Sequence, residues 1–207
     1  MPRTRDTYHH GDLRRALVDA GLAATRGRGA TALGLREVTR QVGVSPNAAY
    51  RHFADRQALL FAVAREIQDR MAEQMRARMP APGDIAPRDR ARLRLRAVGL
   101  GYIAFAVAEP GWFETAFFGP GGEPEGVLRD AHDRLPPPFA LLVEGLDGLV
   151  EAGGLSRERR EGAEWACWSA VHGFAELVVH GPLRGQRPEQ IDRWAERVVD
   201  DIISGIA

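Results

Sequence analysis

One stretch of the sequence, from Leu35 to Phe53, restricts the fold of this chain more than any other. Apolar side chains recur from Leu35 to Val42 at the spacing of one helix face, and Gly43 supplies the left-handed backbone conformation that commonly ends a helix. Ser45 is a favourable N-cap, and the proline after it fits the first position of a new helix, where no N–H is needed. The pattern predicts two short helices joined by a tight turn, which is a helix-turn-helix.

The second helix of this motif has an unusual outward face. Its helical spacing turns Ala49 and Phe53 inward, which leaves a cation, an amide, an aromatic hydroxyl and a small methyl group facing out. This combination suits the base edges and phosphates of a DNA major groove. Asn47 could bond an adenine edge and Ala48 could touch a thymine methyl group, whereas Arg51 suits either bases or phosphates. We expect phosphate contacts from Tyr50 and His52.

The charge of the chain is concentrated at its N-terminal end. The whole sequence has 28 basic and 28 acidic residues and a formal net charge of zero. Residues 1–56 contain ten arginines and five acidic residues, a net charge of +5 that the remaining residues balance. A basic segment on an otherwise acidic chain is typical of a DNA-binding head on a body that does not bind DNA. Every basic residue is arginine, whose planar guanidinium can bind phosphate or guanine through two parallel hydrogen bonds.

Segments on either side of the turn extend the motif. Tyr8-His9-His10-Gly11-Asp12-Leu13-Arg14 precedes it, and Tyr50-Arg51-His52-Phe53-Ala54-Asp55-Arg56-Gln57-Ala58-Leu59-Leu60 continues it. Together with the turn they resemble the TetR family of one-component transcriptional regulators, over a match from about Tyr8 to about Arg70. Further on, Trp168-Ser-Ala-Val-His172-Gly173 resembles a Trp-x-x-x-His-Gly signature in the C-terminal domain of one branch of that family. The resemblance implies a DNA-binding domain over residues 8–70 and an effector-binding and dimerisation domain over residues 85–207.

Other residues are placed to hold the DNA backbone. Arg36 and Thr39 lie on the first helix of the motif, and Arg3 and Arg5 could enter a minor groove. Arg56 stands where the family usually has a phosphate-binding lysine, so the resemblance implies a phosphate contact with altered geometry. The alternative is that this surface is an ordinary solvated polar face. The full set of expected DNA-binding residues is Arg36, Thr39, Ser45, Pro46, Asn47, Ala48, Tyr50, Arg51, His52 and Arg56.

Outside the motif, the sequence is punctuated by glycine and proline and has almost no strand pattern. We therefore predict an all-α fold, with an N-terminal three-helix helix-turn-helix head and a C-terminal helical bundle for ligand binding and dimerisation. Gly119–Gly126 is expected to be a surface loop. Beyond the motif, periodicity and capping residues predict helices at 11–25, 55–79, 88–108, a short stretch from Pro110, 127–135, 139–151, 156–179 and 188–206.

Two helices near the C-terminus have apolar surface to cover. Apart from three polar residues, the segment Trp165–Val179 is apolar on all sides, so neighbours must cover it all round. The last helix carries an apolar stripe at helical spacing through Trp194 and Val198. Two such helices per chain suit a two-fold, four-helix interface, so we expect a homodimer through the last two helices. A dimer would place its reading helices on half-sites about 34 Å apart.

Aromatic residues gather in the C-terminal part of the chain. They favour an apolar effector pocket with few polar groups, and the alternative for each is ordinary core. A histidine in so apolar a helix needs a partner, and Glu176 lies one turn after His172. The resemblance favours the pocket. The expected effector-binding residues are Tyr102, Phe105, Trp112, Phe113, Phe117, Trp168 and His172.

The sequence gives little support to catalysis. It has no nucleophile motif, no phosphate-cradling glycine loop and no metal-spaced ligands, so we expect no catalytic residues, no metal and no cofactor. The single cysteine, Cys167, lies in an apolar run and is interpreted as a small buried hydrophobe. The polar N-terminus and the absence of a membrane-length apolar run predict a cytoplasmic protein without membrane contact.

These observations favour a ligand-responsive, DNA-binding transcriptional regulator. In the mechanism that the resemblance implies, the protein is a repressor that a small apolar or aromatic effector releases from a palindromic operator of double-stranded DNA. One alternative is an architectural DNA-binding protein without an effector. The other is a helical enzyme, for which only His172 and Glu176 could be nominated.

Overall fold

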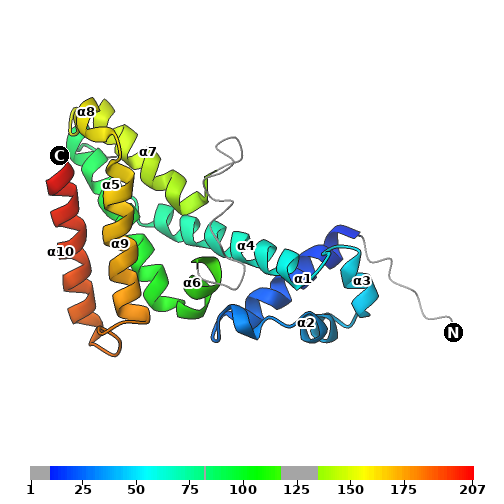
Figure 1. Ribbon diagram of the computed structural model, residues 1–207. Helices are drawn as coiled ribbons and strands as arrows, with labels where there is room; N and C mark the ends of the chain where they lie inside the picture. Colours follow the sequence, from blue (N-terminus) through cyan, green and yellow to red (C-terminus); the bar gives the residue numbers. More distant parts are fainter. Residues whose placement is uncertain (1–9, 82, 118–134) are drawn as a thin grey trace. The chain divides into compact units, whose positions relative to one another are not determined.

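The computed structural model describes residues 10–81, 83–117 and 135–207 (Figure 1). All regular elements in these ranges are helices, which confirms the predicted all-α fold. The chain divides into two compact units. One contains the described residues of 1–67 and 111–124, and the other contains those of 68–110 and 125–207. The expected boundary near residue 70 lies close to this division, but the segment from residue 111 groups with the N-terminal unit.

The N-terminal unit is built around the helix-turn-helix. Its core contains Leu17, Val38 and Val63, which have no exposed surface. Helices α2 and α3 contact α1 and each other, and the first part of α4 belongs to the same unit. The elements are α1 (His10–Thr25), the 3-10 helix η1 (Ala30–Ala32), α2 (Leu35–Val42), α3 (Pro46–Tyr50), the first part of α4 (Arg56–Ala77) and α6 (Pro110–Phe117).

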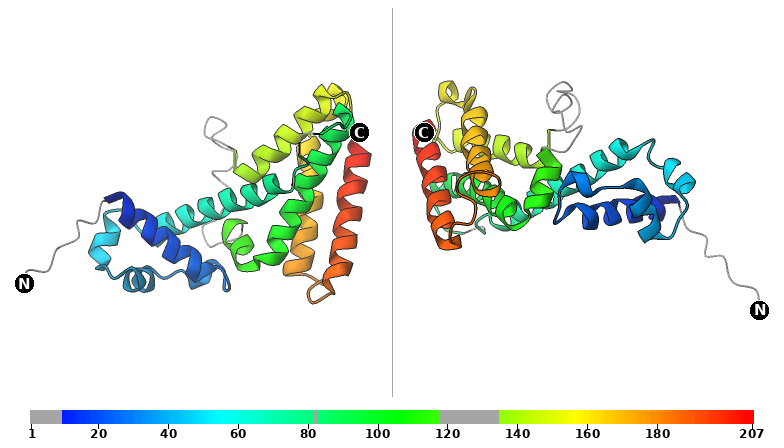
Figure 2. Two further views of the ribbon diagram at one scale, coloured as in Figure 1. Left: turned by 180° about the vertical axis from the view of Figure 1, so that it is seen from behind. Right: turned by 60° about the horizontal axis from the view of Figure 1, so that its bottom comes forward.

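The C-terminal unit is a bundle in which α5 contacts α7, α9 and α10 (Figure 2). Proline occupies the first turn of α5, α7 and α10, where its missing N–H costs nothing. An ion pair from Arg96 Nε to Asp200 Oδ1, 2.8 Å long, links α5 to α10. The elements are α5 (Pro87–Ala108), α7 (Pro137–Glu151), α8 (Arg157–Arg160), α9 (Ala163–Val179) and α10 (Pro188–Ile206), with the last part of α4.

One predicted helix is wrong in its extent. The sequence predicts a single helix from Ser156 to Val179, but the structure has α8 and α9 separated by a break at Gly162. Gly162 adopts a φ of 73°, a left-handed conformation that interrupts the helix. Ser156 does cap α8, since its hydroxyl accepts a hydrogen bond from the backbone N–H of Arg159. The loop expected at 119–126 and nearly all of the helix expected at 127–135 lie outside the described residues.

Candidate functional site

The turn between α2 and α3 has the chemistry that the sequence predicts. Gly43 ends α2 with a φ of 77°, and its N–H donates to the carbonyl of Arg40 at 3.2 Å. Ser45 has an extended backbone, and its hydroxyl accepts a hydrogen bond from Ala48 N–H at 3.3 Å. Pro46 is the first residue of α3. The turn therefore satisfies the helix ends locally and leaves the outer face of α3 available for binding.

Helix α3 buries one side and exposes the other. Ala49 is fully buried and Phe53 is 3 % exposed, as the helical spacing predicts. On the opposite side Tyr50 is 53 % exposed, and Asn47 and Arg51 are also exposed. The remaining two outward positions, Ala48 and His52, are half-buried.

The flanking residues differ in what they can offer to DNA. Arg36 is exposed on α2, whereas Thr39 is only 2 % exposed and donates its hydroxyl to the carbonyl of Arg36 at 2.9 Å. Arg56, the first residue of α4, donates to two backbone carbonyls and is half-buried. Thr39 and Arg56 thus have structural interactions inside the unit. The arm with Arg3 and Arg5 lies outside the described residues.

Charges on the outer face of α2 are partly paired. The Arg40 guanidinium lies 2.6 Å from the Glu37 carboxylate and lowers the pKa of that carboxyl by hydrogen bonding. Both side chains are exposed, so the pair adds little to stability. The nearby carboxylate offsets the charge of Arg40. Arg36 on α2 and Arg51 at the end of α3 are exposed cations that have no ion pair among the described residues.

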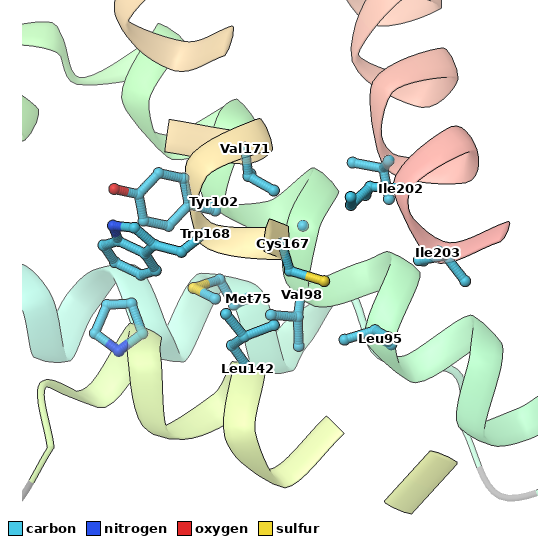
Figure 3. A pocket seen from close by; sticks show the side chains of 13 residues that line it. Met75, Leu95, Val98, Tyr102, Leu142, Cys167, Trp168, Val171, Ile202 and Ile203 are labelled. Atoms are coloured by element: carbon cyan, nitrogen blue, oxygen red, sulfur yellow. The ribbon is translucent and has the colours of Figure 1, made fainter. Parts of the chain in front are cut away.

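The C-terminal unit contains a cavity with an almost entirely apolar wall. Figure 3 shows Tyr102 and Trp168 on one side of it and Ile202 and Ile203 on the other. No lining residue is charged. The space is tight, with room for about two water molecules, so a larger ligand would have to push the wall side chains apart. The wall is formed by Met75, Leu95, Val98, Gly99, Tyr102, Pro138, Leu142, Cys167, Trp168, Val171, Val199, Ile202 and Ile203.

A hydrogen-bonded aromatic cluster adjoins this cavity. The Tyr102 hydroxyl and His172 Nδ1 are 2.7 Å apart, and the Trp168 ring stacks on the His172 ring at an interplanar angle of 14°. Burial raises the pKa of Tyr102 well above its usual value and lowers the pKa of His172. Burial thus favours the neutral form of both groups, which share one hydrogen bond between the hydroxyl and the imidazole. The Glu176 carboxylate, which the sequence offers as a partner of His172, bonds His180 at 3.1 Å, and its charge opposes the lowering of the His172 pKa by burial.

The structure brings only part of the expected effector set to the cavity. Tyr102 and Trp168 line it, and His172 contacts it through Tyr102. Phe105 is fully buried in α5 but is not part of the wall. The three aromatic residues of α6 belong to the N-terminal unit, where the Trp112 indole N–H donates to the carbonyl of Leu22 at 2.9 Å. Trp112, Phe113 and Phe117 are not among the residues that line the cavity.

Most residues of the cavity wall are not predicted from the sequence. Its aliphatic residues have the same helical spacing as ordinary core residues, so no signal in the sequence distinguishes them. Cys167 is buried as predicted, and burial raises the pKa of its thiol to about 11. Its position in the wall was not predicted. The described residues contain no group of three potential metal ligands, and none of their helices is long and apolar enough to span a membrane.

Family models match both halves of the chain. Residues 17–63 match the bacterial regulatory proteins of the tetR family, and residues 95–202 match the tetracyclin repressor-like C-terminal domain. The chain belongs to the TetR family. It is therefore a DNA-binding transcriptional regulator and not an enzyme. TetR-family proteins bind DNA operators and small-molecule effectors, and they form dimers.

The chain is also similar to individual known proteins. The chain is 34% identical over 83 residues to the HTH-type transcriptional regulator BetI of Rhizobium meliloti (strain 1021), a match that covers 40% of each chain. A solved protein of unknown function from Rhodococcus sp. RHA1 has a TM-score of 0.72 and 26% identity, over 97% of this chain and 98% of that one. A TetR variant from Acinetobacter baumannii AYE in complex with minocycline has a TM-score of 0.62 and 19% identity, covering 98% and 96%, which shows the shared fold alone.

Proposed function

We propose that this TetR-family regulator is a repressor that binds a palindromic operator through α3 and leaves it when an uncharged apolar effector occupies the C-terminal cavity. The DNA-binding part of this proposal is supported by the residues exposed on the outer face of α3. Asn47, Tyr50 and Arg51 are exposed together on a helix whose other side is buried. An amide, a phenol and a guanidinium supply base-edge and phosphate contacts from one short surface.

We propose that α9 and α10 form the dimer interface. Two large apolar side chains of the same helix, Trp165 and Leu177 on α9, are 47 % and 45 % exposed. Trp194, Val198 and Ile202 on α10 are only half-buried within the chain. A second copy related by a two-fold axis would cover both helices with the same surface. It would also supply the second reading helix that a palindromic site requires.

The proposal of an uncharged apolar effector is supported by the composition of the cavity wall. An ionised ligand would have to leave water for a wall without a charged side chain, whereas an apolar ligand gains by the transfer. Because the space is tight, occupancy would favour a wider conformation of the unit. In that wider conformation the two reading helices would be positioned poorly for the operator. Bound effector would then weaken operator binding, and bound operator would weaken effector binding by the same free energy.

The α3 assignment can be tested with two variants in a gel-shift assay against the operator and single-base variants of it. Asn47→Ala should change which bases are preferred, at a cost of about 1–3 kcal/mol on the preferred site. Tyr50→Ala should weaken binding to all duplexes alike, since we assign the hydroxyl to a phosphate. The reverse pattern would refute both roles. Footprinting that finds broad coverage instead of a few palindromic sites would favour an architectural DNA binder.

A further inference from the structure

Arg56 makes a forked contact with the chain that leads into the helix-turn-helix. Its Nε donates to the carbonyl of Leu33 and its Nη2 donates to the carbonyl of Ala30, both at 2.6 Å. Arg56 is only half-buried, but both acceptors belong to buried residues, with Ala30 0 % and Leu33 1 % exposed. Hydrogen bonds from a charged donor are stronger than those between neutral groups, so this contact fixes the local backbone.

The position of this contact in the chain gives it a particular effect. Leu33 lies two residues before α2 begins, and Arg56 lies six residues after α3 ends at Tyr50. The contact therefore closes a loop that contains α2, the turn and α3. Both ends of the helix-turn-helix are held to each other, and the orientation of the outer face of α3 depends on that closure.

We infer that Arg56 is a positioning residue for the reading helix and not a phosphate ligand, an inference that rests on the proposed function of α3. Two donors of the guanidinium point at the protein backbone and match two carbonyls at once. A lysine at this position would have a single ammonium group and could not reproduce the planar fork. Arg56 thus acts on DNA through α2 and α3, by keeping Asn47 and Tyr50 in the geometry that contacts the duplex.

The salt dependence of binding separates the two roles. Each phosphate contact releases counterions, so its loss reduces the slope of log affinity against log salt by about 0.9, or by about 1.8 for the two copies in a dimer, whereas loss of a positioning residue leaves the slope unchanged. We would compare Arg56→Lys and Arg56→Gln in the full-length dimer with Arg36→Gln, an exposed cation on α2. Both Arg56 variants should lose about tenfold or more in operator affinity at constant slope. Arg36→Gln should lower the slope.

Hydrogen exchange gives a readout that does not need DNA. In both Arg56 variants, amides from Ala30 through α3 should exchange faster, while those of the C-terminal unit stay at wild-type rates. Full rescue of affinity by Arg56→Lys, together with a reduced slope for Arg56→Gln, would overturn the inference, and so would unchanged exchange in both variants. A wild-type protein without salt-sensitive DNA binding would instead remove the proposed function, and the exchange result would still decide whether Arg56 holds the motif.

Discussion

At the scale of single residues, the pair of Tyr102 and His172 makes the protein sensitive to acid. Burial lowers the folded-state pKa of His172 below its usual 6.5 and outweighs the opposing effect of Glu176. As the pH falls below 6.5, the unfolded chain binds a proton before the folded chain does, so the free energy of unfolding decreases. Above that pH, His172 is neutral in both states and contributes no pH dependence.

Urea unfolding at about pH 7.5 and about pH 5 checks this expectation. The wild type should lose more stability on acidification than His172→Gln, in which the titrating group is gone. Tyr102→Phe should be less stable by about 1 kcal/mol at both pH values, from the lost hydrogen bond, but should keep most of the acid sensitivity because that comes mainly from burial. Equal acid sensitivity in the wild type and in His172→Gln would contradict the assignment.

The same pair shows which residue-level features a sequence can predict. His172 stands out because it interrupts an apolar helix, and this signal is local. Its expected partner Glu176 was inferred from helical spacing, but the actual partner Tyr102 lies on another helix, 70 residues earlier in the chain. Contacts between distant segments depend on how helices pack, which spacing within one helix does not determine. Arg56 illustrates the same limit, since its acceptors Leu33 and Ala30 lie on the other side of the motif.

At the scale of elements, α3 is too short to be stable by itself. It has five residues, far below the length at which an isolated helix forms in water, so it depends on its cap and on the burial of Ala49. Ser45→Ala removes the hydroxyl that accepts from Ala48 N–H and should cost about 1 kcal/mol. Because this loss falls on the reading helix, operator affinity should also decrease.

A second serine cap provides the control for Ser45→Ala. Ser156 caps α8 in the C-terminal unit with the same geometry, since its hydroxyl accepts from the N–H of Arg159 at 3.2 Å. Ser156→Ala should cost a similar free energy of unfolding but leave operator affinity unchanged. Thermal unfolding and a gel-shift titration of both variants make the comparison. Equal effects of the two variants on DNA binding would indicate that α3 does not depend on its cap for recognition.

Elements with strong local signals were predicted well. The last helix has the predicted bounds 188–206, and the turn at Gly43 and Ser45 has the predicted conformations, because proline, glycine and capping residues act locally. The break at Gly162 was missed, since the apolar pattern resumes directly after it and a single glycine is tolerated in many helices. Local signals therefore locate most helix ends, and the error falls where a single glycine interrupts a continuous apolar pattern.

At the scale of the whole molecule, the structural units do not follow chain order. Helix α6 follows α5 directly in sequence but belongs to the N-terminal unit. Gly111 explains the close approach, because a Cβ there would lie 2.4 Å from the carbonyl oxygen of Arg26 and 2.7 Å from that of Thr25. No local pattern in the sequence reveals such an approach, since glycine at a helix start is also common for other reasons.

The proposed assembly makes a prediction about the molecule as a whole. In a two-fold interface the same surface patch of both subunits is buried, so every residue of the patch is buried twice, once in each copy. Leu177→Asp should therefore place two like charges in a desolvated interface and convert the dimer to monomers at micromolar concentration. Leu93→Asp is the matched control, because Leu93 on α5 is 41 % exposed, close to the 45 % of Leu177.

The α9 interface can be tested by measuring the oligomeric state of both variants by sedimentation and their affinity for operator DNA. The Leu93 variant should remain a dimer with wild-type affinity for a full palindrome. The Leu177 variant should be monomeric and should bind a full palindrome no more tightly than an isolated half-site, because the second reading helix no longer arrives with the first. Its helices should persist, since Leu177 is exposed and contributes little to the core of its own unit. A Leu177 variant that stays dimeric and binds normally would place the interface elsewhere than on α9.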